Sequence, residues 1–293
     1  MLTNQPCKRK ETKMAIRIIV DSTADLNERD AEKFRVVPLF VHFGEEEYLD
    51  GVEMKKDEFY DRLVNGDEMP STSQPSPAAF EAVFKEITET GDSAIVITLA
   101  PEFSGTYQSA SIAAEEFENV RVIDSRTVAI GMGILASFAQ KCVEEGKGID
   151  EICALLEEKR DHIKVIALLD TLKYLQKGGR ISKTAAFAGN VLNIKPVISI
   201  FDGKISVLGK ARGSKNSRNM LTEFVQKTGG IDMSMPACLA YSGFSDEMLM
   251  KYVEDSKFLY EGHEDMIQYA SVGATIGTYA GPGAIALAYF EKP

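Results

Sequence analysis

The 293-residue sequence has no tryptophan, only three histidines and only four cysteines. The histidines are scattered and form no HExxH pattern, and no two cysteines have the CxxC spacing of a zinc or redox site. This argues against a structural metal, and unpaired thiols are typical of a reducing compartment. The residues concerned are His42, His162, His263, Cys7, Cys142, Cys153 and Cys238.

Long apolar runs and basic clusters are also missing. No stretch approaches the roughly 20 apolar residues that a membrane helix needs, and the run 15–20 is too short for the core of a signal peptide. The formal net charge of -11 argues against nucleic-acid binding, which needs a cationic surface. We therefore expect a cytoplasmic protein with no nucleic-acid partner and no membrane insertion, preceded by a disordered N-terminal extension over residues 1–14.

Two motifs for nucleotide binding and hydrolysis are absent. The sequence contains neither the GxxxxGK[ST] of a P-loop nor the GxSxG of a nucleophile elbow. Residues 131–136 do fit a G-x-G-x-x-A pattern, but the region about twenty residues later reads as helix rather than as a strand ending in an acid. Close packing of a helix explains these glycines better than a dinucleotide, and we expect no cofactor.

Strands alternate with helices through the first half of the chain. This pattern is typical of a parallel sheet covered by helices on both faces. Pro38 indicates an edge strand, and Ser76 and Pro77 read as the N-cap and first residue of a helix. The expected strands are 16–21, 36–43, 94–100 and 120–124, and the expected helices are 28–34, 56–63, 78–88, 106–117, 129–145 and 149–161.

The second half begins near residue 164 and contains a β-hairpin. Asp202-Gly203 is a dipeptide typical of two-residue hairpin turns. A hairpin implies a mixed sheet, so we predict two lobes, 15–162 and 163–293, with a ligand between them. The expected strands are 165–169, 195–201, 204–209, 237–241 and 284–290, and the expected helices are 172–176, 214–226 and 245–255.

Two short polar loops, 71–77 and 103–107, place small hydroxyl and glycine residues before predicted helices. The second loop follows the apolar run 94–100, and in an open α/β sheet ligands bind beyond the strand ends. Free backbone N–H groups at a helix start favour an anionic group. The loops predict a site for one acid group, held by hydroxyls and amides rather than by a metal.

Ser104 in the second loop has three candidate roles. A nucleophilic serine needs a base, and none of the histidines lies in a recognisable motif. A helix N-cap, with Thr106 competing, is the plainest role, whereas a hydrogen-bond donor to a ligand needs no activation. A serine hydrolase of a small acyl or phosphoryl substrate and a non-catalytic regulatory protein stay open as alternatives. The basic segments 177–180 and 210–215 are either contacts for phosphate or an acidic partner, or solvated turns.

Six segments, in order from about residue 15 to the C-terminus, resemble the DegV family of bacterial fatty-acid-binding proteins. Each segment is a weak signal alone, but their common order makes the resemblance specific. The segments are Asp21-Ser22-Thr23-Ala24-Asp25-Leu26, Thr-Ser-Gln-Pro-Ser-Pro at 72–77, Ser104–Ala110, Val122–Arg126, Leu175–Ile181 and Gly281–Ala284.

The resemblance implies a two-lobe α/β fold over about 15–291. The N-terminal lobe would be a three-layer α/β/α unit with a parallel sheet, and the C-terminal lobe a two-layer unit with a mixed sheet. It also implies that a tunnel between the lobes holds a long-chain fatty acid, whose carboxylate is bound by Thr72 and Ser104. On this basis the chain is a lipid carrier and not itself an enzyme. Secondary site candidates are Gly105, Thr106, Tyr279 and Arg212.

Members studied as fatty-acid kinase subunits present the bound acid to a separate ATP-binding protein, which phosphorylates it. Arg212 lies in the family's basic segment and is the candidate contact with such a partner. Many members have His-x-Gly-Pro-Gly where this chain has Tyr279-Ala-Gly-Pro-Gly. Tyrosine donates a hydrogen bond but is not cationic near neutral pH. If the histidine assists phosphoryl transfer, the change favours a carrier or lipid sensor over a kinase subunit.

Overall fold

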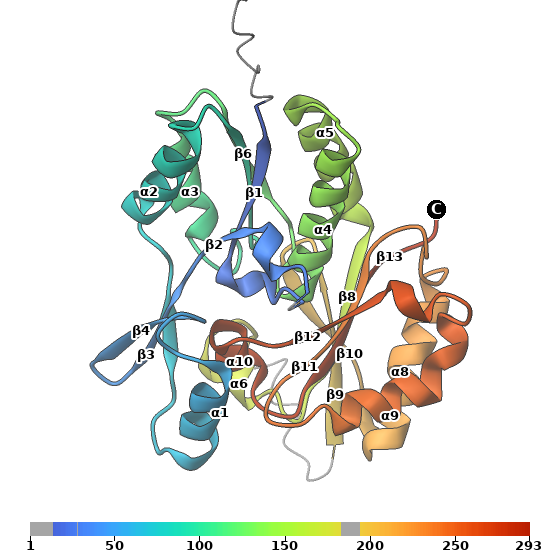
Figure 1. Ribbon diagram of the computed structural model, residues 1–293. Coiled ribbons are helices and arrows are strands. Elements are labelled where there is room, and N and C mark those ends of the chain that lie inside the picture. The colour runs from blue at the N-terminus through green and yellow to red at the C-terminus, as the bar shows by residue number, and fades with distance from the viewer. Residues whose placement is uncertain (1–13, 28, 183–193) are drawn as a thin grey trace, which may run out of the picture.

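The structure is a computed structural model that describes residues 14–27, 29–182 and 194–293. Its strands form two main sheets and a small third sheet, and its helices cover these sheets (Figure 1). Of the predicted extension over residues 1–14, residues 1–13 lie outside the described residues. The α/β class predicted from the alternating pattern is confirmed.

The first sheet has four parallel strands in the order β2-β1-β6-β7. Helices α2 and α3 cover one face and α4 and α5 the other, which gives the three predicted layers (Figure 1). The Ser76 side chain accepts from the N–H of Ala79 and Pro77 opens α2, so the predicted cap is confirmed. The elements are β1 (Ile16–Asp21), β2 (Arg35–Val37), β6 (Ser93–Thr98), β7 (Val120–Asp124), α2 (Pro77–Thr88), α3 (Thr106–Ala114), α4 (Ile130–Glu144) and α5 (Ile149–Lys159).

The second sheet has six strands in the order β10-β9-β8-β13-β11-β12. Only β11 and β12 run parallel within it, so the predicted mixed sheet is confirmed. Asp202 and Gly203 both have positive φ, 49° and 64°, as the hairpin turn between β9 and β10 requires. The elements are β8 (Ile163–Leu168), α6 (Lys173–Lys177), β9 (Ile194–Phe201), β10 (Lys204–Arg212), α8 (Ser214–Lys227), β11 (Ala237–Tyr241), α9 (Glu247–Ser256), β12 (Ile267–Ser271), α10 (Ala274–Ala280) and β13 (Ile285–Phe290).

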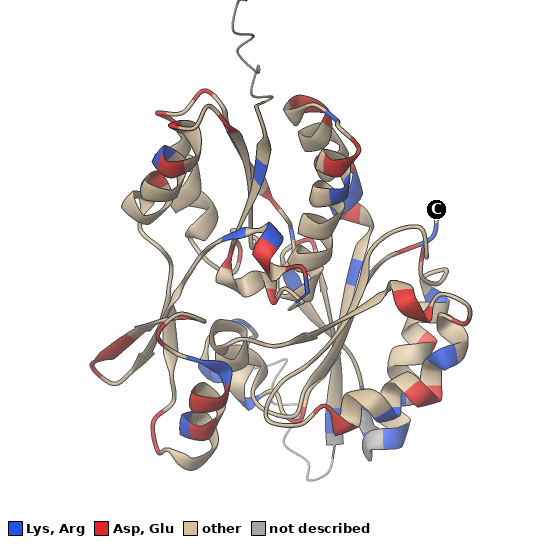
Figure 2. Ribbon diagram, viewed as in Figure 1, with Lys and Arg blue, Asp and Glu red and all other residues tan. Residues whose placement is uncertain are grey.

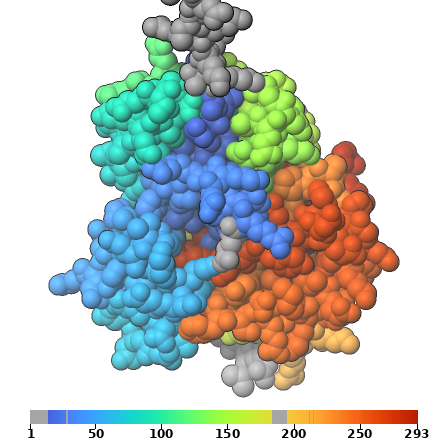
Figure 3. All heavy atoms as spheres, viewed as in Figure 1, coloured from blue at the N-terminus to red at the C-terminus, as the bar shows by residue number. Residues whose placement is uncertain are grey.

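A third, antiparallel sheet corrects the prediction of one strand over 36–43. The chain leaves the first sheet after β2, at Pro38, and enters a separate sheet in the order β4-β3-β5. The predicted edge position is confirmed for β2. This sheet and α1 pack against α10 from the far end of the chain (Figure 1). On the face seen in Figure 3, light-blue atoms of the N-terminal half lie directly against orange atoms of the C-terminal half. The elements are β3 (Phe40–Phe43), β4 (Glu46–Leu49), α1 (Lys56–Asn65) and β5 (Ser71–Ser73).

The predicted helix over 28–34 is wrong in its described part. Only a single 3-10 turn forms there, over Ala31–Lys33. The segment has no buried apolar stripe, and its polar side chains instead bond locally: Asn27 accepts from the N–H groups of Arg29 and Asp30. Such local side-chain acceptors compete with helix formation.

Helix α4 lies between the two main sheets and contacts β1 and β6 of the first as well as β8, β11 and β13 of the second. Its glycines permit this approach. A Cβ on Gly133 would lie 2.6 Å from the carbonyl oxygen of Ala24, and one on Gly131 would lie 2.6 Å from Thr127 Oγ1. The packing interpretation of the G-x-G-x-x-A pattern is therefore confirmed. The lobe ranges 15–162 and 163–293 stay a prediction, and α4 packs against both main sheets within one buried cluster.

Gly133→Ala should destabilise the protein although alanine is the better helix former. The clash with the Ala24 carbonyl forces a backbone shift, which costs about 1–3 kcal/mol, against a gain of about 1 kcal/mol in helix propensity. We expect a net loss of up to about 2 kcal/mol in the free energy of unfolding, measured by denaturant titration. Gly146→Ala is a poor control because its φ is +79°. Gly148→Ala, whose Cβ meets nothing within 4 Å, introduces no clash. Because Gly148 is the N-cap of α5, it should cost less than about 1 kcal/mol through the weaker capping of alanine.

Many of the charged side chains lie on the helices and connections, and the strands β6, β11, β12 and β13 of the two main sheets carry none (Figure 2). Among the described residues, no helix has both the length and the apolarity to cross a membrane.

Candidate functional site

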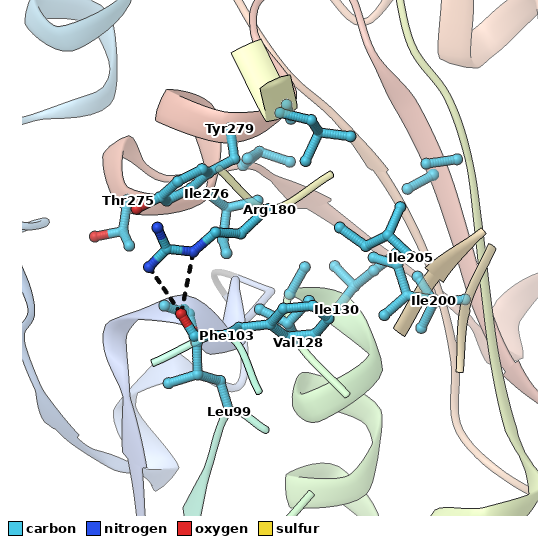
Figure 4. A pocket seen from close by; sticks show the side chains of 18 of the residues that line it. Leu99, Phe103, Val128, Ile130, Arg180, Ile200, Ile205, Thr275, Ile276 and Tyr279 are labelled. Atoms are coloured by element: carbon cyan, nitrogen blue, oxygen red, sulfur yellow. Dashed lines mark hydrogen bonds between the residues drawn. The ribbon is translucent and has the colours of Figure 1, made fainter. Parts of the chain in front are cut away.

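An apolar cavity of about 370 Å³ lies beside α4 and the second sheet. Its walls come from both halves of the chain, and Figure 4 shows Val128 and Ile130 facing Ile200 and Ile205 across it. The volume falls within the range of about 300–1,000 Å³ that is usual for small-molecule sites. Its aliphatic lining includes Leu39, Leu99, Val128, Ile130, Val165, Leu169, Leu175, Ile198, Ile200, Ile205, Val272, Ile276 and Ile285.

A row of alanines crosses the central strands where they face this cavity. Ala167 on β8 pairs in register with Ala286 on β13, which pairs in turn with Ala240 on β11. All three line the cavity. Because larger residues at these positions would project into the same space, the alanine row keeps the cavity open over the sheet.

Thr72, one of the two principal candidates, lines the cavity. Figure 4 shows Arg180, Thr275 and Tyr279 on one side of the cavity, away from Ile200 and Ile205, and we call this side the polar end. Thr72 is not in a loop before a helix, as the sequence suggested, but in the middle of β5, paired with Val41 of β3. Its Oγ1 lies 2.6 Å from the hydroxyl of Tyr279 on α10 and is hydrogen-bonded to it. The structure thus brings together two candidates that are 207 residues apart in the sequence.

Ser104 lines the cavity as well, beyond the carboxyl end of β6, as the sheet argument predicted. Its Oγ lies 2.9 Å from Thr106 Oγ1 and accepts a long hydrogen bond from the Thr106 N–H. Gly105, which also lines the cavity, is the N-cap residue of α3, so Ser104 precedes the cap. The Gln74 amide fixes this loop by donating to the carbonyl of Gly105 and to Ser109.

Arg180 is a cavity residue that the sequence showed only as part of a basic segment. Its guanidinium donates twice to the carbonyl of Phe103, at 3.2 and 2.9 Å, and stacks 4.9 Å from the ring centroid of Tyr279 (Figure 4). It therefore ties the segment after α6 to the loop that carries Ser104. The basic segment 177–180 was the only indication in the sequence, and nothing in it predicts that Arg180 would bind the carbonyl of Phe103.

Thr23 brings a buried carboxyl close to the cavity. Thr23 lines the cavity, and its hydroxyl and N–H both donate to Asp21 Oδ1. Leu99, on the neighbouring strand end, donates its N–H to Asp21 Oδ2 at 2.9 Å. Burial raises the pKa of Asp21 to about 6 in spite of these donors. The sequence analysis did not predict this role, because Asp21 is the last residue of an expected strand and nothing in the sequence indicates that its carboxyl group is buried.

The contacts of Ser104 bear on the hydrolase alternative. Within the described residues, none of the three histidines is hydrogen-bonded to Ser104: His42 contacts Ser73 and Glu47, and His162 faces Glu291. The described residues also hold no cluster of three or more metal-ligating side chains.

Arg212 is exposed at the end of β10 and does not line the cavity.

These features define an α/β protein with a largely aliphatic cavity whose polar lining includes several hydroxyl groups. The chain belongs to the DegV family: the family model described as "Uncharacterised protein, DegV family" matches residues 15–292. A DegV domain-containing protein of Caldanaerobacter subterraneus is 34% identical over 94% of this chain and 99% of its own length. The family resemblance stated from the six segments is confirmed.

Two solved structures extend the comparison. A DegV family protein from Thermus thermophilus, described as binding fatty acid, superposes with a TM-score of 0.84 at 32% identity over 95% of this chain and 100% of its own. A stearic-acid-binding protein from Eubacterium ventriosum superposes with a TM-score of 0.82 at 27% identity over 94% of this chain and 98% of its own. DegV proteins of this fold therefore include fatty-acid-binding members.

Proposed function

We propose that this protein binds a long-chain fatty acid in the apolar cavity, with the carboxyl group at Thr72 and Ser104. One observation carries the proposal: the cavity lining is mostly aliphatic, and Thr72 and Ser104 belong to the polar group at one end of it, with Tyr279 and Arg180. The fatty-acid-binding relatives support the same ligand class. We further propose that the cavity is the tunnel between the lobes and that the chain is a cytoplasmic carrier.

The energetics agree with this assignment. Burying a sixteen-carbon chain at about 0.8 kcal/mol per methylene contributes on the order of 11 kcal/mol before ordering costs. The hydroxyls then mainly orient the head group. Burial would raise the pKa of the bound carboxyl group, whereas the Arg180 guanidinium at the same end of the cavity would lower it. The hydroxyls of Thr72 and Ser104 can serve either protonation state.

The double variant Thr72→Ala/Ser104→Ala tests the head-group assignment. We expect fatty-acid affinity to fall by roughly 5- to 150-fold, since two net hydrogen bonds of roughly 0.5–1.5 kcal/mol each are lost, with no change in folding. Isothermal titration with palmitate measures the affinity, and thermal unfolding without ligand measures the stability.

Ser71→Ala is the matched control, because Ser71 lies on the same strand but does not line the cavity. It should bind palmitate as the unchanged protein does. Unaltered affinity and head-group position in the double variant would remove Thr72 and Ser104 from the site. Absence of lipid from protein purified from its host, by native mass spectrometry, would count against the ligand class as a whole.

We also propose that the bound carboxyl is presented to a separate ATP-binding kinase. A surface depression lined by Glu102, Ser104, Arg180 and Lys204 adjoins the polar end of the cavity and supports access from outside. Arg212 remains the proposed contact with that kinase. Because Tyr279 replaces the histidine of many members, we expect slow acyl-phosphate formation, measured as hydroxamate after mixing loaded protein, ATP and the kinase. A serine-directed covalent probe that labelled Ser104 would instead favour a hydrolase.

A further inference from the structure

Helix α10 is held by two buried carboxylates from the other end of the chain. Asp25 Oδ1 accepts from the N–H of Gly273 at 2.7 Å. Asp50 accepts from the next two N–H groups, those of Ala274 at 3.1 Å and Thr275 at 3.2 Å. The first N–H groups of a helix have no partner within the helix, so these two side chains satisfy three consecutive donors.

The helix supplies no cap of its own. Its N-cap residue is Gly273, which has no side chain to accept from the helix. A Cβ there would lie 3.3 Å from Asp25 Oδ1 and 3.5 Å from Asp50 Oδ1. The glycine therefore leaves room for both carboxylates at one helix end. Asp25 and Asp50 are both buried, with 7% and 5% of their surfaces exposed.

The same short helix carries the polar end of the cavity. Thr275, Ile276 and Tyr279 all line the cavity, and Figure 4 shows them on one segment of ribbon. Tyr279 lies one helical turn after Thr275, the last of the anchored residues, and its hydroxyl contacts Thr72. A second anchor, the Tyr60 hydroxyl, donates to the carbonyl of Val272 just before the helix. A shift of the helix start would therefore move Tyr279 relative to Thr72.

We propose that Asp25 and Asp50 are positioning residues for ligand binding: by fixing the start of α10 they set the contact between Tyr279 and Thr72, and with it the affinity for the acid head group. The inference rests on the proposed function. It assigns no contact between either carboxylate and the ligand. Their effect on binding passes through Tyr279.

A double-mutant cycle between Asp50→Asn and Tyr279→Phe tests this route, because residues that act through one another show non-additive effects. Asparagine keeps one acceptor oxygen and replaces the other with an NH₂ group that cannot accept. We expect Asp50→Asn to lower palmitate affinity about five- to tenfold, the scale of one hydrogen bond. In the Tyr279→Phe background the same change should lower affinity less than twofold.

Thermal unfolding without ligand supplies the second readout. Asp50→Asn should lower the unfolding midpoint equally in both backgrounds, because the cap is lost in each. Gly273→Ala, which crowds both carboxylates without removing them, should repeat the affinity pattern. Asp255→Asn is the matched control: Asp255 holds α8 through Arg218, at 2.9 and 2.7 Å, and does not line the cavity. It should lower stability and leave affinity unchanged.

The outcomes separate the two proposals. If the unchanged protein binds no palmitate, the proposed function fails. If it binds palmitate and the losses from Asp50→Asn and Tyr279→Phe simply add, or Asp50→Asn leaves affinity unchanged, the positioning role is overturned and the proposed function stands.

Discussion

Replacing Ala286 with leucine should lower the affinity for a sixteen- or eighteen-carbon acid by about 60-fold, since displacing about three methylenes at about 0.8 kcal/mol each costs about 2.4 kcal/mol. Ala286 is the middle residue of the alanine row and is partly accessible, unlike its buried partner Ala240. The added carbons therefore enter cavity space that the acyl chain would fill. Competition binding with a fluorescent fatty acid measures the change.

A series of acids of decreasing length is the internal control for Ala286→Leu. Short acids need less of the cavity, so their affinity should change little and the preference should shift toward shorter chains. Ala286→Ser adds a single atom and should cause only a small loss. An equal loss of affinity for short and long acids would show that the substitution disturbs the fold instead of shortening the cavity.

The contribution of Asp21 to stability should decline as pH rises. Its pKa in the folded protein is about 6, against an ordinary value of 3.8. The protonated form is therefore the one that folding favours. Its stabilising contribution is full below 3.8 and is lost as pH rises through about 6, by about 3 kcal/mol over the whole titration at 1.36 kcal/mol per pKa unit.

Comparison with Asp21→Asn isolates this effect, because asparagine does not titrate. The difference in free energy of unfolding between the unchanged protein and the variant should shrink from pH 4.5 through about pH 6 and then level off. Asp92→Asn gives the opposite sign: the Ala15 N–H lowers the pKa of Asp92, so its contribution is lost as pH falls. A flat difference for Asp21→Asn would mean that Asp21 is solvated. Burial also raises the pKa values of Asp25, Asp50 and Asp124, so the unchanged protein alone would not identify Asp21.

Elements with local signals were predictable from the sequence. Ser76 and Pro77 mark the start of α2 in two adjacent residues, and Asp202-Gly203 defines its hairpin without help from the rest of the chain. The strand of residues 16–21 was likewise predicted at its full length, because a short, mainly aliphatic run followed by turn residues is typical of a buried strand.

The missed elements depend on distant partners. β5 has only three residues, Ser-Thr-Ser, and exists because β3 pairs with it. α10 contains Gly277 and two threonines, so its propensity is low, and its cap comes from Asp25 and Asp50. β12 has the same dependence on β11.

The same distinction applies to the candidate site. Thr72 and Ser104 were selected from their motifs, and the fold shows that both line one cavity. Their immediate partners were not predictable, because Tyr279 lies 207 residues from Thr72 and Arg180 lies 77 residues from Phe103. Pairings over such distances leave no periodicity in the sequence.

The position of α4 between the sheets has a consequence for how the chain folds. Its apolar side chains belong to a single buried cluster that runs from Ile18 of β1 to Phe290 of β13. A polypeptide cut near residue 162 would leave that helix without the second sheet, and would leave the second sheet covered only by α8 and α9 on its other face. Both halves must therefore assemble in one cooperative step, and an acyl chain bound beside α4 would reinforce the whole molecule against unfolding rather than one part of it.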